Sequence, residues 1–501
     1  MKLRTLILSS ALGMAATGAL VWSAVQPSTH GSGPATADPT KPTPPPSKPV
    51  DHSHFQAGKT LMVEGRLGHA VLPADLDNET FLFVDVSGAD VIAKNAAPLD
   101  LSIVIDKSGS MAGKRLTNAI AAAKTAIERL RDGDVVSVIS FNTSVDVVIH
   151  PTTIDATSRG KLVGQLAAIH AGGDTCISCG IDTAMQLLAQ RDGMVERVLL
   201  LSDGQPTAGV RDVDGFKRIA ENCRRMGASV TTIGVDVEYD EKVMSALARS
   251  SNGHHFFVAD PTGLPTIFDS EMASLTKTVA NRAELTVDLA PGVTADRVFD
   301  RSTTGTGSQL VVPLGSFSAG DHKTVLMHLR VPRGNAGERP IAAVRLHYDD
   351  LADSKPGDCE GALATRLSTV TAELTPLDAL VSARVTATEA AGTLESSNAL
   401  FRAGHADQAH ALLVQEQRKL AETRRQAVSL APAEKRPDVE RAFDKTSDAL
   451  AGDDDFARPT AGASAGSATP VTASPPPPPA ADRKGQAQVR RNEQTAIEVT
   501  E

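Results

Sequence analysis

Four nearly uninterrupted apolar runs constrain the fold of this chain more than any other feature. The runs are Leu101–Ile105, Val135–Phe141, Val198–Leu201 and Val230–Val235. Strands that are apolar at every position must be covered on both faces, which is typical of parallel sheets flanked by helices. Between the first two runs, apolar residues recur at helical spacing, at Leu116, Ile120, Ala123, Ile127 and Leu130. We therefore predict a doubly wound, mostly parallel, Rossmann-like α/β sheet over residues 98–281.

Side chains that carry oxygen follow two of these runs. Asp106-Lys-Ser108-Gly-Ser110 follows the first run, with a carboxylate and two hydroxyls at alternate positions. Asp203 follows the third run, and Thr175 comes shortly after Gly172-Gly173. In a doubly wound sheet, ligands bind beyond the carboxyl ends of the strands. Asp106 and Asp203 occupy such ends, so fold and motif predict a site at the same edge.

These residues match a known motif in order, type and spacing. Asp106, Ser108, Ser110, Thr175 and Asp203 resemble the metal-ion-dependent adhesion site of the von Willebrand factor type A (VWA) domain, in its bacterial exported form. The resemblance implies that Ser108, Ser110 and Thr175 touch a divalent metal, with Asp106 and Asp203 acting largely through water. It implies Mg²⁺, with Mn²⁺ or Ca²⁺ as alternatives.

The chemistry of such a site favours binding over catalysis. Mg²⁺ prefers about six oxygen ligands and gives up its water reluctantly. A first shell built from neutral hydroxyls leaves the ion electrophilic, and one position stays open for a carboxylate of a partner protein. We therefore predict a non-enzymatic, metal-dependent, adhesion-type module that binds an Asp or Glu of a partner. Two alternatives stay open: an envelope assembly factor with a structural metal, and an accessory subunit of an enzyme or chaperone complex.

Motifs expected of enzymes do not occur in the sequence. None of the 13 histidines lies in a His-Glu-x-x-His arrangement, and there is no Gly-x-Ser-x-Gly elbow. Gly109–Lys114 has one residue too few for a phosphate loop, and Arg115 stands where that loop places the serine or threonine that binds Mg²⁺. We predict that the protein is not an enzyme.

The threonine loop departs from the family pattern. Asp174 separates Thr175 from the two glycines, whereas related sequences usually place the threonine directly after them. Asp174 is either a surface acid or a residue that reaches the metal and weakens its pull on a partner. Cys176 and Cys179 follow in a Cys-x-x-Cys spacing at the start of a predicted helix. A local disulfide, pairing with Cys223 or Cys359, and a redox role all remain open.

The N-terminal segment indicates export. Met1–Arg4 is positively charged, Thr5–Val25 carries no charge, and residues 26–57 form a Pro/Ser/Thr-rich linker. We interpret residues 1–25 as a signal peptide or an N-terminal membrane anchor, a choice that stays open. The expected location is the periplasm, the cell envelope or the exterior.

The regions on either side of the α/β domain have a different period. In Leu285–Leu289 and Val325–Val331, apolar residues alternate with polar ones, which predicts a β-sandwich over 282–352. Two strands alone are not stable, so we expect the strands of residues 58–97 to pair with this sandwich. The α/β domain is then an insertion in it.

The C-terminal part of the chain reads as helical and then as low-complexity sequence. Residues 367–451 are rich in Ala, Leu, Glu and Arg, and Ala399–Leu413 resembles the junction of a helical hairpin. Residues 452–481 form a Pro/Ala/Ser-rich linker, which we predict to be disordered, and 482–501 a C-terminal tail. A net charge of −10 and only 3% aromatic residues argue against nucleic acid as a partner.

Overall fold

The computed structural model describes residues 52–90, 97–188, 194–236, 239–275, 277–305, 307–451 and 480–499. The predicted signal or anchor over 1–25, nearly all of the linker over 26–57 and most of 452–481 lie outside these ranges. Among the helices of the described residues, none combines the length and the apolar character that crossing a membrane requires.

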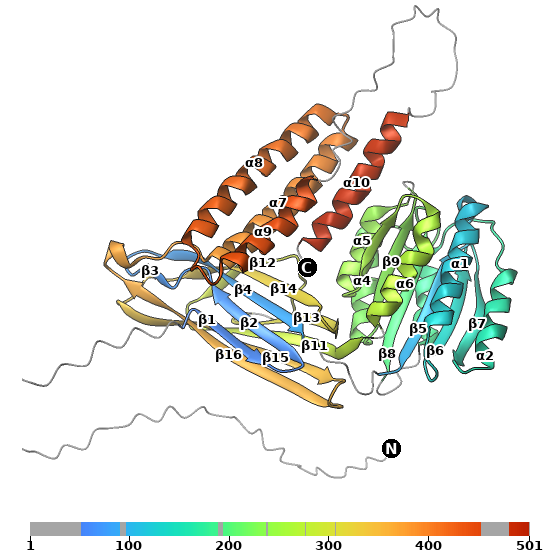
Figure 1. The fold of residues 1–501 in the computed structure, drawn as a ribbon, viewed down its shortest axis with the longest axis horizontal. Helices are drawn as coiled ribbons and strands as arrows, with labels where there is room; N and C mark the ends of the chain where they lie inside the picture. The colour runs from blue at the N-terminus through green and yellow to red at the C-terminus, as the bar shows by residue number, and fades with distance from the viewer. Residues whose placement is uncertain are drawn as a thin grey trace, which may run out of the picture. The chain divides into compact units, whose positions relative to one another are not determined.

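A six-stranded sheet forms the central part of the chain, in the order β10-β9-β8-β5-β6-β7 (Figure 1). All neighbours are parallel except β6 and β7. The strands are β5 (Leu99–Asp106), β6 (Val135–Phe141), β7 (Val145–Thr153), β8 (Val195–Ser202), β9 (Ser229–Val235) and β10 (His255–Val258). The helices are α1 (Lys114–Arg129), α2 (Ser158–Gln165), α3 (Ile177–Leu187), α4 (Val213–Arg225), α5 (Glu241–Ser250) and α6 (Leu264–Leu275).

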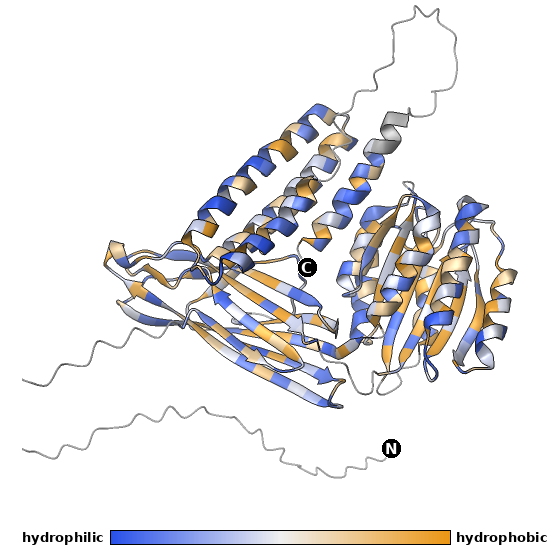
Figure 2. Cartoon of the chain, viewed as in Figure 1, coloured by the Kyte–Doolittle hydropathy of each residue, from blue (hydrophilic) through white to orange (hydrophobic). Residues whose placement is uncertain are grey.

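The apolar runs are buried because the sheet has helices on both faces. Alternate residues of each strand belong to two separate cores. Leu199 and Leu201 pack with α1 and α6, whereas Val198 and Leu200 pack with α3, α4 and α5. Figure 2 shows the central strands of this sheet in the colour of hydrophobic residues. The predicted doubly wound α/β fold is confirmed.

Two five-stranded sheets form a sandwich from the segments on either side of this domain. One sheet contains β1 (His54–Gly58), β2 (Leu61–Leu67), β4 (Asn78–Gly88), β14 (His322–Val331) and β12 (Thr294–Phe299), in that order. The other contains β13 (Gln309–Ser318), β11 (Thr278–Leu289), β15 (Gly337–Asp350), β16 (Lys355–Ser368) and β3 (Val71–Pro73). The antiparallel pairing of β4 with β14 joins strands from before and after the α/β domain.

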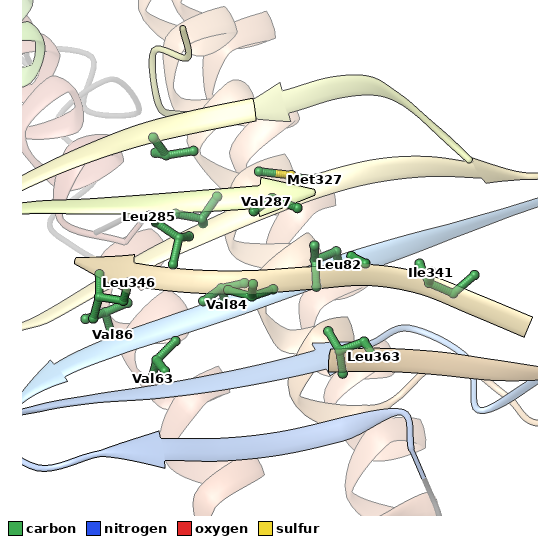
Figure 3. Packing of buried hydrophobic residues seen from close by; sticks show 14 of the residues in the cluster. Val63, Leu82, Val84, Val86, Leu285, Val287, Met327, Ile341, Leu346 and Leu363 are labelled. Carbon is green, nitrogen blue, oxygen red and sulfur yellow. The ribbon is translucent and has the colours of Figure 1, made fainter. Parts of the chain in front are cut away.

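A single core holds the two sheets of the sandwich together. Figure 3 shows Leu82 and Val84 of β4 among Leu285 and Val287 of β11 and Leu346 of β15. All of these side chains are buried. Residues more than two hundred positions apart therefore share one apolar interior.

Both predicted outer boundaries of the sandwich are wrong. The linker does not extend to residue 57, because β1 begins at His54 and pairs with β2. The sandwich does not end at 352, because β16 pairs with β15 over its whole length. Most residues of the predicted C-terminal tail, 482–501, belong to the helix α10 (Ala480–Glu498). These segments have weak patterns of their own, and partners elsewhere in the chain fix their structure.

The helical region begins later than residue 367, after the end of β16. It consists of α7 (Ala379–Arg402), α8 (Ala406–Leu430) and α9 (Arg436–Ala451), followed by α10. The turn between α7 and α8 lies within the predicted hairpin junction. Arg384 of α7 donates hydrogen bonds to Thr324 and Asp300, which connects this region to the sandwich.

Truncation of Leu82 tests the shared core of the sandwich. Leu82 is fully buried, so Leu82→Ala should lower the free energy of unfolding by about 2–5 kcal/mol through lost burial and a residual cavity. Urea unfolding followed by circular dichroism measures this change. Leu76→Ala is the control, because Leu76 is 58% exposed and its truncation should change stability by less than about 0.5 kcal/mol. Equal effects would contradict the packing described.

Candidate metal-binding site

The β5 strand ends in a carboxylate that is held at both oxygens. Asp106 is the last residue of β5 and is fully buried. Its Oδ1 accepts a hydrogen bond from the amide of Ser108 at 2.8 Å, and its Oδ2 accepts one from the hydroxyl of Ser202 at 2.5 Å. Ser202 belongs to the neighbouring strand β8. The aspartate therefore connects two adjacent strand ends and fixes the start of the following loop.

The two serines of this loop lie next to the end of β8. The hydroxyls of Ser108 and Ser110 are 3.1 Å apart, and Ser110 Oγ donates to Asp203 Oδ1 at 2.8 Å. Met111 follows in a short 3-10 turn, and its fully buried side chain anchors the loop in the core. Ser108 and Asp203 are buried, whereas Ser110 is exposed. The cluster is therefore held in place by buried side chains on one side and is open to solvent at Ser110.

The threonine loop is attached to the same place by backbone hydrogen bonds. The amide of Gly172 donates to the carbonyl of Lys107 at 2.8 Å, and the amide of Gly109 donates to that of Gly173 at 3.1 Å. A side-chain carbon at Gly204 would lie 3.4 Å from Thr175 Oγ1 and 3.7 Å from Ser110 Oγ. The structure thus brings all five predicted residues to one edge of the sheet. Because Gly204 has no side chain, the space beside the hydroxyls of Thr175 and Ser110 stays free.

Thr175 is held on its other side by the loop after β8. Its amide donates to Thr207 Oγ1 at 2.8 Å, and the amide of Thr207 donates back to its carbonyl at 2.9 Å. Asp174 is exposed, and its amide donates to Thr143 Oγ1. The extra residue in this loop therefore has a solvent-facing side chain and a tethered backbone.

A disulfide between Cys176 and Cys179 follows the threonine directly. Cys176 is the N-cap of α3, and Cys179 lies in the first turn of that helix. The other two cysteines are free thiols, Cys223 buried and Cys359 half-buried. Burial raises the pKa of Cys223 to about 12 and that of Cys359 to about 11, so both thiols stay protonated near neutrality. The structure therefore contains the local pairing among the alternatives left open by the sequence.

An arginine that the motif does not contain faces this site. Arg115, in the first turn of α1, donates from Nη1 to Asp203 Oδ2 at 2.6 Å and to the carbonyl of Ser110 at 3.1 Å. Its Nη2 donates to Asp236 Oδ2. Asp236 follows β9 directly, as Asp203 follows β8. This repetition of an aspartate after adjacent buried strands is the signal that could have revealed Asp236.

Burial makes the carboxylates of this site harder to ionise. Burial raises the pKa of Asp106 to about 6, although hydrogen bonds from Ser202 and Ser108 oppose the shift. Burial also raises the pKa of Asp203, against hydrogen bonds from Ser110 and Arg115. A cation bound here would compensate the buried negative charge.

The donor set fits a hard divalent cation. Across the residues that the structure describes, no three or more His, Cys, Asp or Glu side chains are grouped so that they alone could hold a metal ion. A site here therefore depends on hydroxyl ligands as well. The cluster offers hydroxyl and carboxylate oxygens, which suit Mg²⁺, Mn²⁺ or Ca²⁺ rather than zinc or copper. Ser108, Ser110 and Thr175 supply neutral oxygens, while Asp106 and Asp203 supply the charge.

The paired histidines near β10 have structural partners. His255 is fully enclosed and hydrogen-bonded to Thr232 Oγ1 at 2.8 Å and to the hydroxyl of Tyr239 at 3.1 Å. Burial lowers its pKa to about 3, so it is neutral at physiological pH. His254 lies 3.1 Å from the buried carboxylate of Glu271. His255 therefore belongs to the interior of the fold, whereas the partly exposed His254 pairs with a buried carboxylate at its boundary.

Comparison with known proteins agrees with this fold. Residues 100–270 match the von Willebrand factor type A domain family. This part of the chain is a VWA domain, as the motif predicted. The predicted bounds, 98–281, enclose the matched residues.

Two bacterial relatives are similar over about half of the chain. The uncharacterized protein sll0103 from Synechocystis sp. is 25% identical over 269 residues, which are 52% of this chain and 63% of that protein. The uncharacterized protein YfbK from Escherichia coli is 24% identical over 245 residues, which are 48% of this chain and 42% of that protein. In each case less than two thirds of the relative's length is matched.

A solved structure shares the fold over a larger part of the chain. The von Willebrand factor type A protein from Catenulispora acidiphila superposes with a TM-score of 0.63 at 19% identity. The similarity covers 75% of this chain and 90% of that one. The shared fold therefore extends beyond the VWA domain.

The raised pKa of Asp106 predicts that the free energy of unfolding of the metal-free protein depends on pH. A carboxyl whose pKa is higher in the folded state destabilises that state once it ionises. The cost is absent below about pH 4 and complete above about pH 6, at about 3 kcal/mol. In EDTA, Asp106→Asn should therefore be more stable than wild type near neutrality, with the gap closing toward about pH 4. Urea unfolding across this range measures it, and a gap independent of pH would contradict the assignment.

Proposed function

We propose that this protein binds a divalent cation at the edge of its VWA domain and, through that ion, a carboxylate of a partner protein. Ser108, Ser110 and Thr175 would hold the ion directly, and Asp106 and Asp203 would act largely through water. When bound, the ion supplies an electrophilic position for an Asp or Glu side chain. The function is adhesion or protein recognition, without catalysis.

The hydrogen bond from Ser110 to Asp203 carries this proposal. It joins two loops that are 93 positions apart in the sequence and brings a hydroxyl and a carboxylate within 2.8 Å. Ser110 is exposed, so a partner could reach an ion held beside it. Oxygen donors that converge at a solvent-facing edge support a binding site.

The architecture of the loops argues against a purely structural metal. Backbone hydrogen bonds already connect the loop after β5 with the threonine loop, and Asp106 already fixes the amide of Ser108. The disulfide adds a further restraint next to Thr175. Loops held in this way are restrained by the chain itself as well as by any ion. The metal is therefore available for recognition.

We further propose that the protein works in the cell envelope or outside the cell. The charge pattern of residues 1–25 is that of an export signal or an anchor. The Cys176–Cys179 disulfide supports this location, because disulfides persist in oxidising compartments. An exported location also makes an accessory role in a cytoplasmic complex a weaker candidate.

Metal titration tests the site itself. Isothermal titration with Mn²⁺ should show one bound ion in wild type, and Asp106→Ala or Ser110→Ala should weaken binding at least about tenfold through loss of charge or of a ligand. Asp214→Ala is the matched control, since Asp214 is an exposed acid on α4 and should bind Mn²⁺ as wild type does. Wild-type protein that binds no Mn²⁺ would overturn the proposal.

Peptide binding tests the mode of recognition. Peptide arrays that present Asp or Glu should retain the Mn²⁺-loaded protein, and the same peptides with Asn or Gln should not, because only a carboxylate can complete the coordination. EDTA should release the protein. Retention that is equal in EDTA, or equal on the amide peptides, would contradict recognition through the metal.

A further inference from the structure

Three aspartates and one arginine form a charged group at the carboxyl ends of adjacent strands. Asp106 ends β5, Asp203 follows β8 and Asp236 follows β9, and these strands are neighbours in the sheet. The guanidinium of Arg115 lies between the last two carboxylates. Lys107, which follows Asp106 directly in the sequence, is paired with Asp146 instead.

The position of Arg115 is fixed by more than one contact. It donates to Asp203, to Asp236 and to the carbonyl of Ser110, and its side chain is 20% exposed. The side chain of Asp203 is fully buried and that of Asp236 is 12% exposed. Ion pairs with so little exposure are weakly screened, so the charge of Arg115 acts on the proposed metal site at short range.

We propose that Arg115 sets the charge of the metal site and thereby its selectivity. This inference rests on the proposed function. The three carboxylates and the guanidinium together leave a formal charge of about minus two, which one divalent cation neutralises. A neutral loaded site still accepts a partner's carboxylate. Without the guanidinium, the site would hold cations more tightly and repel the incoming acid.

The charge of Arg115 also makes the site discriminate between divalent and trivalent ions. An excess of negative charge favours an ion of charge three more strongly than an ion of charge two. The guanidinium removes this excess. Arg115 is thus a positioning and selectivity residue that acts through Asp203, rather than a ligand of the ion.

Four variants separate the charge of Arg115 from its structural contacts. Arg115→Gln removes the charge, Arg115→Lys keeps it, Asp236→Asn makes the site less negative, and the double variant Arg115→Gln/Asp236→Asn restores the formal charge of wild type. The measurements are titration with Mn²⁺, Tb³⁺ luminescence and retention on the acidic peptides. Thermal unfolding followed by circular dichroism verifies that each variant folds.

Removal of the charge of Arg115 should change the affinities for metal and for peptide in opposite directions. Arg115→Gln should bind Mn²⁺ about tenfold more tightly, and Tb³⁺ by a larger factor, yet bind the acidic peptides more weakly. Asp236→Asn should bind Mn²⁺ about tenfold more weakly. Arg115→Lys and the double variant should both stay within about threefold of wild type.

Two results would overturn the inference while leaving the proposed function intact. The first is that wild type binds Mn²⁺, while the folded Arg115→Gln variant binds Mn²⁺ with the same or a lower affinity. The second is Arg115→Lys behaving as Arg115→Gln does, because the contacts rather than the charge would then matter. If wild type binds no Mn²⁺, the proposed function itself fails, and the two failures are thereby distinguished.

Discussion

The parallel pairing of β9, β8 and β5 is the constraint on which the rest of this structure depends. Parallel neighbours end at the same edge, so residues that follow them meet there even when they are far apart in the sequence. Asp106, Asp203 and Asp236 come together for this reason. Burial of both faces of the sheet keeps the strands in register. The site's geometry is therefore a consequence of the core.

The sequence predicts the α/β domain well because its strands carry their own signal. Runs such as Val135–Phe141 are apolar at every position, and their bounds in the structure agree closely with the prediction. Asp106 and Asp203 also lie at the carboxyl ends of β5 and β8, where the apolar runs predict them. Local sequence suffices here, since each strand must be covered on both faces whatever its partners.

Elements that depend on distant partners were not predictable in the same way. The sequence of β16 contains Pro356 and two glycines, and its pairing with β15 gives it the strand conformation. Most of α10 is polar, and polar contacts hold it: Gln494 accepts from the amide of Phe257, and Asn492 donates to Asn398. Such contacts leave no period in the sequence.

Arg115 shows the same limit at the candidate site. In the sequence it is only a basic residue at the start of a helix, and its two carboxylate partners lie far away in the chain, directly after β8 and β9. A motif identifies the residues that would surround an ion, but the charge of the site also depends on such neighbours. For this protein, the motif names the expected ligands, and the charged neighbours seen in the structure define the net charge around them.

The position of a bound metal ion decides whether these side chains form a metal site. Anomalous scattering from crystals soaked in Mn²⁺ would show where the ion lies. We expect a peak bounded by the hydroxyls of Ser108, Ser110 and Thr175, with Arg115 still paired with Asp203 beside it. A peak elsewhere, or hydroxyls too far apart to share one ion, would contradict this expectation.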